Sequence, residues 1–449
     1  MQSSALPLGH AAGLGSKLPL RDRISCGMGE RLLVLSNGHG EDLIAMRVLN
    51  ALERHRPQLQ PAVLPLVGQG AAYAAAEAAG RLQRVGPRLQ LPSGGFSNQS
   101  LRGLLADLGA GLPLLSWRQW QLVRAWGRSG RPVLAVGDLL PLLLAWASGG
   151  PYGFIGTPKS DYTWASPPPS GWGASPLADA YHRLKGSEWD PWEWALMAHR
   201  RCRLVAVRDA LTARGLRRHG VAALAPGNPM MDGLVAAPLP ARLRSRRRLL
   251  LLAGSRMPEA LSNAERLLGA LNQLPAEAAI TVLLATGREP SPAQLAPLLQ
   301  HQGYALQPAE AGPTAPEPDA APAAIWRRGS IELWIGTGRF AAWAGWAEVG
   351  LANAGTATEQ LTGLGIPALS LPGAGPQFKA GFARRQSRLL GGAVVPCHTP
   401  SELAERLHVL LHNPALRRQL GRQGQRHMGP DGGSTAIAAL IEARLLAAG

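Results

Sequence analysis

The stretch LLLLAGSRMPEA, residues 249–260, decides the fold class of this chain. Four successive leucines indicate a buried strand, because strands of parallel sheets are covered on both faces and are almost wholly apolar. Ala253 and Gly254 then permit a tight turn, and Glu259 opens the helix that follows. Between them, Ser255 and Arg256 offer a hydroxyl and a guanidinium fork suited to a diphosphate. An ordinary capped turn with a surface arginine is the alternative interpretation.

The same succession of strand, turn and helix recurs on both sides of this stretch. Before it come apolar runs that end in Gly, Asp or Ser, namely RLLVLS from Arg31, PVLAVGD, YGFIGT and CRLVAVRD. After it come AITVLLATG, IELWIGTG, VGLANAG and IPALSLPG, with helical stretches between them. Strands that alternate with helices are typical of parallel α/β sheets. The sequence therefore predicts two α/β units.

The length of 449 residues suits two or three domains of about 150 residues each. We expect a disordered N-terminal extension over 1–28, with Met28 as an alternative start. A first domain is predicted over 29–226, an interdomain linker over 227–245 and a second domain over 246–430. Residues 431–449 are predicted to form a C-terminal helix that can cross back to the first domain.

The charge balance favours anionic partners. Lysine and arginine number 46 against 29 aspartates and glutamates, which gives a net charge of +17. Arginine enrichment in a GC-rich genome explains the same balance equally well. No nucleic-acid-binding motif accompanies the charge, so we predict no nucleic-acid partner. The three cysteines are widely spaced, and we find neither a secretory signal nor a membrane-spanning run, which predicts a cytoplasmic protein.

Polar, Gly-rich loops follow several predicted strands, where open parallel sheets bind ligands. SNGHGED, residues 36–42, feeds a helix whose N–H groups would favour a phosphate or a substrate, and His39 there is either a base or a cap. Gly355 and Thr356 in NAGTATEQ open another helix, with Glu359 and Gln360 able to accept from ribose hydroxyls. Together with residues 254–259, this loop predicts a nucleotide-diphosphate site. Gln377 is a further donor-site candidate.

Three motifs in this order, GNPMMD, LLAGSRMPE and NAGTATEQLTGLGIPAL, resemble the donor-domain motifs of lipid-A-disaccharide synthase. That enzyme resembles in turn other lipid-linked glycosyltransferases of the glycosyltransferase-B fold. The resemblance covers roughly residues 31–449. It implies two Rossmann-like domains that face each other across a cleft, with a UDP-sugar held mainly by the second and a lipid-linked acceptor near the first. It implies no metal and no cofactor.

The resemblance carries over residue by residue. The Gly-Ser-Arg-x-x-Glu motif of the family matches Gly254, Ser255, Arg256 and Glu259, and its Gly-Thr-Ala motif begins at Gly355. Its Gly-His-Pro motif matches residues 227–229, where Asn228 replaces the histidine and removes a titrating group. The acceptor-side loop differs most, and its candidate residues here are Asn37, Gly38, Gly40 and Glu41. The departures leave the sugar and the acceptor open.

A transferase of this kind needs a base to take the proton of the attacking acceptor hydroxyl. Asp138, after PVLAVG, and His39 are the candidates, although Asp138 could instead be a helix N-cap. Arg256 and the amides near Gly355 would offset the charge that grows on the leaving diphosphate. Two rival interpretations remain. One is a non-hydrolysing UDP-sugar epimerase, and the other is an inactive UDP-sugar-binding or membrane scaffold protein.

A tryptophan-rich segment bears on membrane association. In LPLLSWRQWQLVRAWGR, residues 112–128, Trp117 and Trp120 fall at helical spacing beside arginines, which would suit an interfacial helix at an anionic membrane surface. Packing of the tryptophans in the core is the alternative. Together with the lipid acceptor that the resemblance implies, this segment leads us to expect a cytoplasmic protein able to lie peripherally on the inner face of a membrane.

Overall fold

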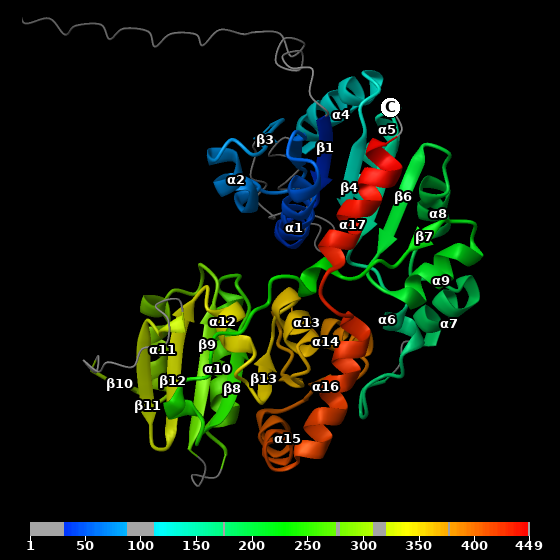
Figure 1. Ribbon diagram of the computed structural model, residues 1–449. Coiled ribbons are helices and arrows are strands. Elements are labelled where there is room, and N and C mark those ends of the chain that lie inside the picture. Colours follow the sequence, from blue (N-terminus) through cyan, green and yellow to red (C-terminus); the bar gives the residue numbers. More distant parts are fainter. Residues whose placement is uncertain are drawn as a thin grey trace, which may run out of the picture.

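The computed structural model describes residues 31–87, 112–173, 176–274, 279–308, 320–375 and 378–447. Within these residues the chain forms two α/β domains, each built on a largely parallel sheet (Figure 1). The prediction of two parallel-sheet α/β domains is therefore confirmed. The expected extension over 1–28 and the candidate Gln377 lie outside the described residues.

The sheet of the first domain has the strand order β3-β2-β1-β4-β5-β6-β7, and its described pairings are parallel. The strand order reverses between β1 and β4. The segments that follow these two strands therefore turn to opposite faces of the sheet, which leaves a crevice at the carboxyl ends of the strands. Its strands are β1 (Arg31–Ser36), β2 (Gln60–Pro65), β3 (Gln83–Arg84), β4 (Val133–Gly137), β5 (Tyr152–Gly156), β6 (Cys202–Val207) and β7 (Ala223–Leu224).

Helices cover both faces of this sheet. Helix α1 (His39–His55) packs beside α17 (Gly433–Ile441) on one face, which Figure 1 shows toward the viewer. The other face is covered by α4 (Leu112–Arg128), α5 (Leu139–Ala147) and α8 (Pro191–Met197). The remaining helices of the domain are α2 (Ala74–Ala78), α6 (Tyr162–Ala165), α7 (Pro176–Lys185) and α9 (Ala210–Arg218). Within the described parts of the chain, no helix is both long and apolar enough to cross a bilayer.

The second sheet repeats the same topology, with the order β10-β11-β12-β9-β8-β13-β14-β15 and a reversal between β8 and β13. Among the described strands, β10 pairs antiparallel with β11, β11 pairs antiparallel with β12, and the other pairings are parallel. The strands are β8 (Arg247–Leu252), β9 (Ile280–Thr286), β10 (Ala305–Leu306), β11 (Ala324–Arg328), β12 (Ile331–Thr337), β13 (Val349–Ala352), β14 (Ala368–Ser370) and β15 (Val394–Pro396). The leucines at 249–252 make up the last four residues of β8 and are buried, as is typical of strands in parallel sheets.

Helices also flank the second sheet on both faces. They are α10 (Glu259–Leu271), α11 (Pro292–His301), α12 (Phe340–Ala344), α13 (Thr356–Gly363), α14 (Ala380–Leu389), α15 (Pro400–His412) and α16 (Pro414–Met428). Helix α10 packs into one apolar core of this domain and α13 into the other. The chain then returns to the first domain through α17, which ends in a π-helical turn over Glu442–Leu446.

Two connections join the domains. The linker between β7 and β8 meets the start of α17, where the Asp232 carboxylate accepts backbone N–H groups of Gly432 and Ser434, both at 2.6 Å. Away from this hinge, α14 of the second domain packs on α6 of the first. There Arg388 is buried and its guanidinium binds both carboxylate oxygens of Asp179, at 2.8 and 2.9 Å.

Candidate functional site

The crevice of the first domain is built around Asp138, which follows β4. Asn37 Nδ2 donates a 2.7 Å hydrogen bond to Asp138 Oδ1 and so joins the loops after β1 and β4. The same oxygen accepts the Leu140 N–H at 3.2 Å, which makes Asp138 the N-cap of α5. The alternative prediction, that Asp138 caps a helix, is therefore confirmed for the start of α5. Its place at the strand reversal also suits a ligand contact, so its catalytic role stays a prediction.

Glu41, predicted only as an acceptor-side loop residue, has the more unusual carboxyl group. It lies in the first turn of α1, where a Cβ at Gly38 would be 3.3 Å from its Oε2 and a Cβ at Gly137 would be 3.4 Å from its Cγ. Burial is the main cause that raises the pKa of Glu41 to about 7, and the nearby charges of Asp138 and Asp42 contribute to the rise. Its own backbone N–H and the Thr157 hydroxyl oppose the rise in pKa. A carboxyl group that titrates near neutrality is suited to proton transfer.

The neighbouring Asp42 serves to hold this loop in place. Ser36 Oγ donates to Asp42 Oδ1 at 2.5 Å, and the Tyr73 hydroxyl donates to Ser36 Oγ at 2.8 Å. Burial raises the pKa of Asp42 to about 6. The chain of bonds ties the end of β1 to α1, which fixes the direction in which the helix begins. His39 is the first residue of α1, and its side chain is outside the described part of the structure.

The crevice of the second domain is held open by a buried amide network. Asn353 Nδ2 donates to Asn263 Oδ1 at 3.2 Å and to Leu371 O at 2.8 Å, while Asn353 Oδ1 accepts the Leu371 N–H at 2.9 Å. Asn263 in turn donates to Ala253 O at 3.1 Å. The network joins the ends of β8, β13 and β14. Sequence reasoning missed Asn263, because in the sequence it has the appearance of an ordinary helical residue.

The glycine at the turn after β8 is required by geometry. Gly254 has φ +92°, and a Cβ there would lie 3.3 Å from the Asn353 carbonyl oxygen. Ser255 and Arg256 follow at the surface, where a ligand can reach both side chains. Partial burial lowers the pKa of Arg256, against an opposing effect of Glu259, and the guanidinium remains charged at neutral pH. Glu259 accepts the Phe378 N–H at 2.8 Å and so anchors the loop before α14.

The turn after β13 presents the start of α13. Thr356 is exposed, and the space in front of Gly355 is open. Gln386 on α14 donates to Ala354 O at 2.9 Å and to Gly355 O at 3.4 Å, which supports the turn from behind. A helix start with a hydroxyl and an unobstructed backbone is suited to bind an anion.

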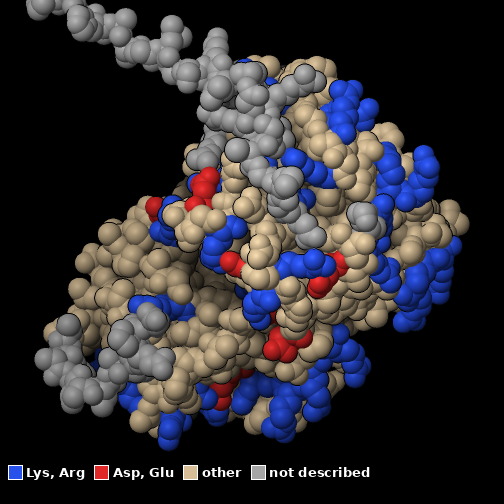
Figure 2. Space-filling model, turned by 45° about the horizontal axis from the view of Figure 1, so that its top comes forward, with Lys and Arg blue, Asp and Glu red and all other residues tan. Residues whose placement is uncertain are grey.

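The two crevices meet across the domain boundary. A Cβ at Gly40 would lie 3.7 Å from Thr356 Oγ1, so the loop after β1 and the start of α13 are neighbours. Arg208, at the end of β6, donates to Glu359 Oε2 at 2.8 Å, and both side chains are largely buried. Figure 2 shows the surface hollowed between the two domains. The sequence-predicted residues at 37–41, 138, 254–256 and 355–356 are thus gathered in one region.

The hinge engages the other predicted residues. Gln360 is buried and its amide donates to Met230 O at 2.6 Å, while the Asn228 side chain accepts the Met230 N–H at 3.1 Å. Gly227 has φ +126°, and a Cβ there would lie only 2.9 Å from Gly433 Cα, at the start of α17. A ribose contact by Glu359 or Gln360, and a donor contact by Asn228, therefore remain predictions, since all three side chains already bind protein groups. Sequence reasoning missed Arg208 because its partner is 151 residues away.

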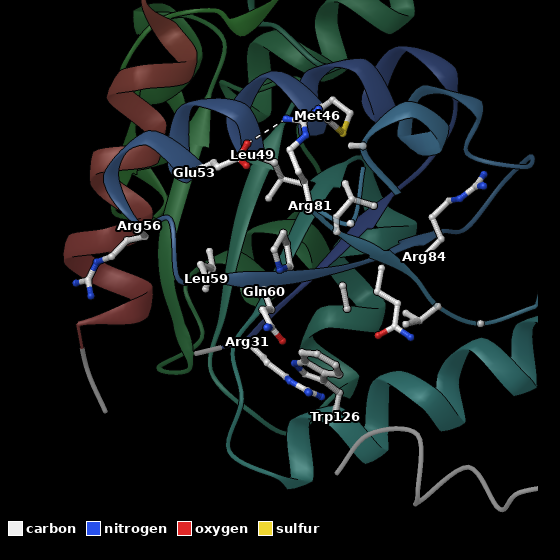
Figure 3. Close-up of a pocket in the computed structure, with 18 of the residues that line it drawn as sticks. Arg31, Met46, Leu49, Glu53, Arg56, Leu59, Gln60, Arg81, Arg84 and Trp126 are labelled. Atoms are coloured by element: carbon white, nitrogen blue, oxygen red, sulfur yellow. Dashed lines mark hydrogen bonds and ion pairs between the residues drawn. The ribbon is translucent and has the colours of Figure 1, made fainter. Parts of the chain in front are cut away.

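A cavity of about 1210 Å³ lies elsewhere in the first domain (Figure 3). Its wall includes Leu49 of α1, Arg84 of β3 and Trp126 of α4. Arg31 and Gln60, which also line it, begin β1 and β2, so the cavity lies beside the amino ends of these two strands. It is at the opposite edge of the sheet from Asn37 and Asp138 and does not belong to the candidate site.

Two Rossmann-like domains, with their strand reversals facing each other, define the glycosyltransferase-B fold. Solved structures share it. They include Staphylococcus aureus MnaA in a co-structure with UDP (TM-score 0.55, 13% identity, 92% of this chain and 96% of that chain). Neisseria meningitidis UDP-GlcNAc 2-epimerase bound to UDP-GlcNAc has a TM-score of 0.52 and 12% identity over 92% of this chain and 100% of that one. Acinetobacter baumannii MurG has a TM-score of 0.53 and 15% identity, and the match covers 92% of this chain and 99% of that one.

At these identities the likeness establishes the fold. Comparison of the sequence with protein-family models and with curated proteins finds no match.

Proposed function

We propose that this protein is a UDP-sugar-dependent enzyme that transfers a hexosyl group to an acceptor hydroxyl. The observation that carries the proposal is the apposition of the two strand reversals, with Gly40 next to Thr356. A nucleotide diphosphate on the second domain would then direct its sugar toward Glu41 and Asp138 on the first. The structural neighbours with UDP or UDP-GlcNAc bound support this choice of donor.

The binding groups have distinct tasks in this proposal. Arg256, Ser255 and the backbone at Gly355 and Thr356 would receive the diphosphate, because a guanidinium and a helix start both offset its negative charge. As the acceptor oxygen bonds to the anomeric carbon, the bond to the diphosphate breaks and UDP leaves. The acceptor proton passes to a carboxylate, for which Glu41 or Asp138 is placed. The sequence resemblance further suggests a lipid-linked acceptor.

Epimerisation of the UDP-sugar is a second candidate. It is favoured by the pKa of Glu41, about 7, because a carboxyl group poised near neutrality can also take a proton from, and return it to, a sugar carbon. An epimerase from Neisseria meningitidis shares the fold. Such a reaction would need the same donor site and no acceptor.

The first test concerns the donor site. Thermal unfolding is measured with and without UDP for the wild type, for Arg256→Ala and for the control Arg327→Ala, whose exposed side chain lies on strand β11. Saturation at 100 times the dissociation constant stabilises a protein by about 2.7 kcal/mol. We expect a UDP-dependent shift in the wild type and the control and a reduced shift in Arg256→Ala. No shift with any uridine nucleotide would overturn the proposal.

The second test separates the two reactions. UDP-GlcNAc is incubated with the protein in D₂O, first without an acceptor and then with a panel of lipid-linked and soluble hydroxyl acceptors. A transferase releases UDP only when an acceptor is present and returns the unused donor free of carbon-bound deuterium. Deuterium in the recovered sugar nucleotide, without an acceptor, would instead establish epimerisation.

A further inference from the structure

The outer face of three adjacent helices in the first domain is unusually apolar. Helix α5 lies between α4 and α8 and packs on both. Large apolar side chains point to solvent along this layer, with exposed fractions between 37% and 56%: Leu114 and Trp117 on α4, Leu140, Leu143 and Trp146 on α5, and Trp192 on α8. A surface helix ordinarily has charged or polar residues on its outer side. We call this layer the α4–α5–α8 face.

Helix α5 differs most from an ordinary surface helix. Its sequence LLPLLLAWA contains no polar side chain. Leu142, Leu144 and Ala145 point inward and are buried, so the outward positions are occupied by other apolar residues rather than by polar ones. On α4, Trp117 stacks on Trp120 with ring centroids 4.8 Å apart, and more than half of Trp117 remains exposed. Large apolar patches on a monomer surface mark sites of interaction.

The charges on this face are almost all positive. Neither α4 nor α5 contains Asp or Glu, and Glu193 on α8 is buried and paired with Lys159 at 2.5 Å. Arg128 is exposed on α4, and so is Arg118, which also lines the cavity of about 1210 Å³. Within the described residues of these three helices there is thus no exposed acid. The combination of leucine, tryptophan and arginine is characteristic of surfaces that bind anionic lipid headgroups.

The position of the face relates it to the candidate site. Helix α5 begins directly after Asp138, and α4 and α8 precede parallel strands, so all three helices start at the carboxyl edge of the sheet. Leu114, Leu140 and Trp192 lie in the first turns of their helices, at the same edge as the crevice. An amphiphilic acceptor held at a surface on this side would therefore be close to Asp138 and Glu41.

We propose that the α4–α5–α8 face docks on an anionic phospholipid bilayer and inserts its leucines and tryptophans between the headgroups. This proposal rests on the proposed transferase function and adds to it the surface from which a lipid-linked acceptor would reach the site. A second copy of the chain is a poorer occupant, because a symmetric dimer through this face would bury exposed arginines of both copies with no exposed acid in the described parts of the three helices to pair with them. A bilayer containing anionic lipid presents the opposite charge.

The test is co-sedimentation of the full chain with vesicles of phosphatidylcholine alone, or with phosphatidylglycerol added as a minor component. The variant Leu140→Gln/Leu143→Gln removes two exposed leucines from the face. The control Leu306→Gln/Val409→Gln removes two similarly exposed aliphatic side chains from the second domain. We expect the wild type and the control to bind anionic vesicles, with binding that falls as salt rises, and the α5 variant to bind about tenfold less.

The readouts keep this proposal separate from the donor site. The UDP-dependent thermal shift should be the same in the wild type and the α5 variant, which also shows that the variant is folded. The docking proposal is overturned if the wild type binds neither kind of vesicle, or if the α5 variant binds as well as the control. Either result counts against docking even if UDP binds. Sedimentation equilibrium that shows a dimer lost in the α5 variant would assign the face to self-association instead.

Discussion

At the scale of single residues, Glu41 is the group whose chemistry the fold changes most. Its burial raises its pKa to about 7, and a base acts only when ionised. We therefore predict that the turnover of the wild-type enzyme rises with pH up to about 7 and levels off above it. Glu41→Gln should lower turnover roughly 10²- to 10⁴-fold. The matched control is Glu53→Gln, on an exposed turn of the same helix, which should keep normal turnover.

The same experiment distinguishes Glu41 from Asp138. Asp138→Asn replaces the carboxylate with an amide of nearly the same shape. The amide oxygen can still accept the hydrogen bonds from the Asn37 side chain and the Leu140 N–H. If Asp138 is the base, this variant loses turnover by orders of magnitude while UDP binding is kept. Full turnover in Glu41→Gln together with loss in Asp138→Asn would assign the proton transfer to Asp138.

Glu41 also makes a prediction about stability. Its pKa is higher in the folded state than the ordinary value of 4.5, so between pH 4.5 and about 7 the folded chain binds more protons than the unfolded chain. The free energy of unfolding therefore falls as pH rises through this window. Glu41→Gln removes the cost of burying a charged carboxylate, so the variant should be more stable than the wild type at pH 8 by about 2–3 kcal/mol. At pH 4 the two should unfold alike. Urea unfolding at both pH values measures the difference, and an equal difference at the two pH values contradicts the assignment.

At the scale of elements, the contact of α14 with α6 and α7 fixes one domain against the other. Arg388 donates to both oxygens of Asp179, and also to Ser166 O at 2.8 Å and to Trp164 O. Arg388→Ala leaves a buried carboxylate without its partner, which typically costs about 3–5 kcal/mol of stability. Arg422→Ala, at an exposed position on α16, should change stability by no more than about 0.5 kcal/mol. Thermal and urea unfolding test both variants.

A double variant sharpens this prediction. Asp179→Ala combined with Arg388→Ala removes both charges, so no buried charge is left without its partner. We expect its loss of stability to be clearly smaller than the two single losses added together. Strict additivity would show that Arg388 and Asp179 do not act as a pair.

The elements also show what the sequence can and cannot predict. The strand at 249–252 and the turn at Gly254 follow from local composition, because four leucines and a glycine leave few other structures. The start of α13 at Thr356 is equally local. The pairs Asn263 with Asn353, and Arg208 with Glu359, depend on the packing of distant segments, and no spacing along the chain reveals them. The burial of Glu41 is hidden for the same reason, since Gly137 ends β4 and Thr157 follows β5, both far from Glu41 along the chain.

At the scale of the whole molecule, the chain crosses between the domains twice, once at the linker and once at α17. Arg47 on α1 donates to Pro229 O at 2.7 Å and to Met230 O at 2.8 Å, so the first domain holds the linker directly. Together with the α14 contact, these connections determine how close the two crevices lie. The distance between Gly40 and Thr356 is therefore a property of the domain arrangement and not of either loop alone.

A pair of engineered cysteines measures that arrangement in solution. A Cβ at Gly40 would lie 3.7 Å from Thr356 Oγ1, which is within the reach of a disulfide. Gly40→Cys/Thr356→Cys should form this bond under mild oxidation, as detected by mass spectrometry of peptides. Of the three native cysteines, Cys202 and Cys397 should not compete, because burial raises the pKa of each to about 12 and leaves little thiolate.

The control for this cross-link is Gly40→Cys/Gly269→Cys. Gly269 lies on α10 with open space in front of it, so a cysteine there is accessible but should not bond to residue 40. Because the bond between residues 40 and 356 joins the mouths of the two crevices, the oxidised protein should lose its UDP-dependent thermal shift and recover it when the bond is reduced. Equal cross-linking in both variants, or none in either, would mean that the domains are arranged differently in solution and that the two crevices do not form one site.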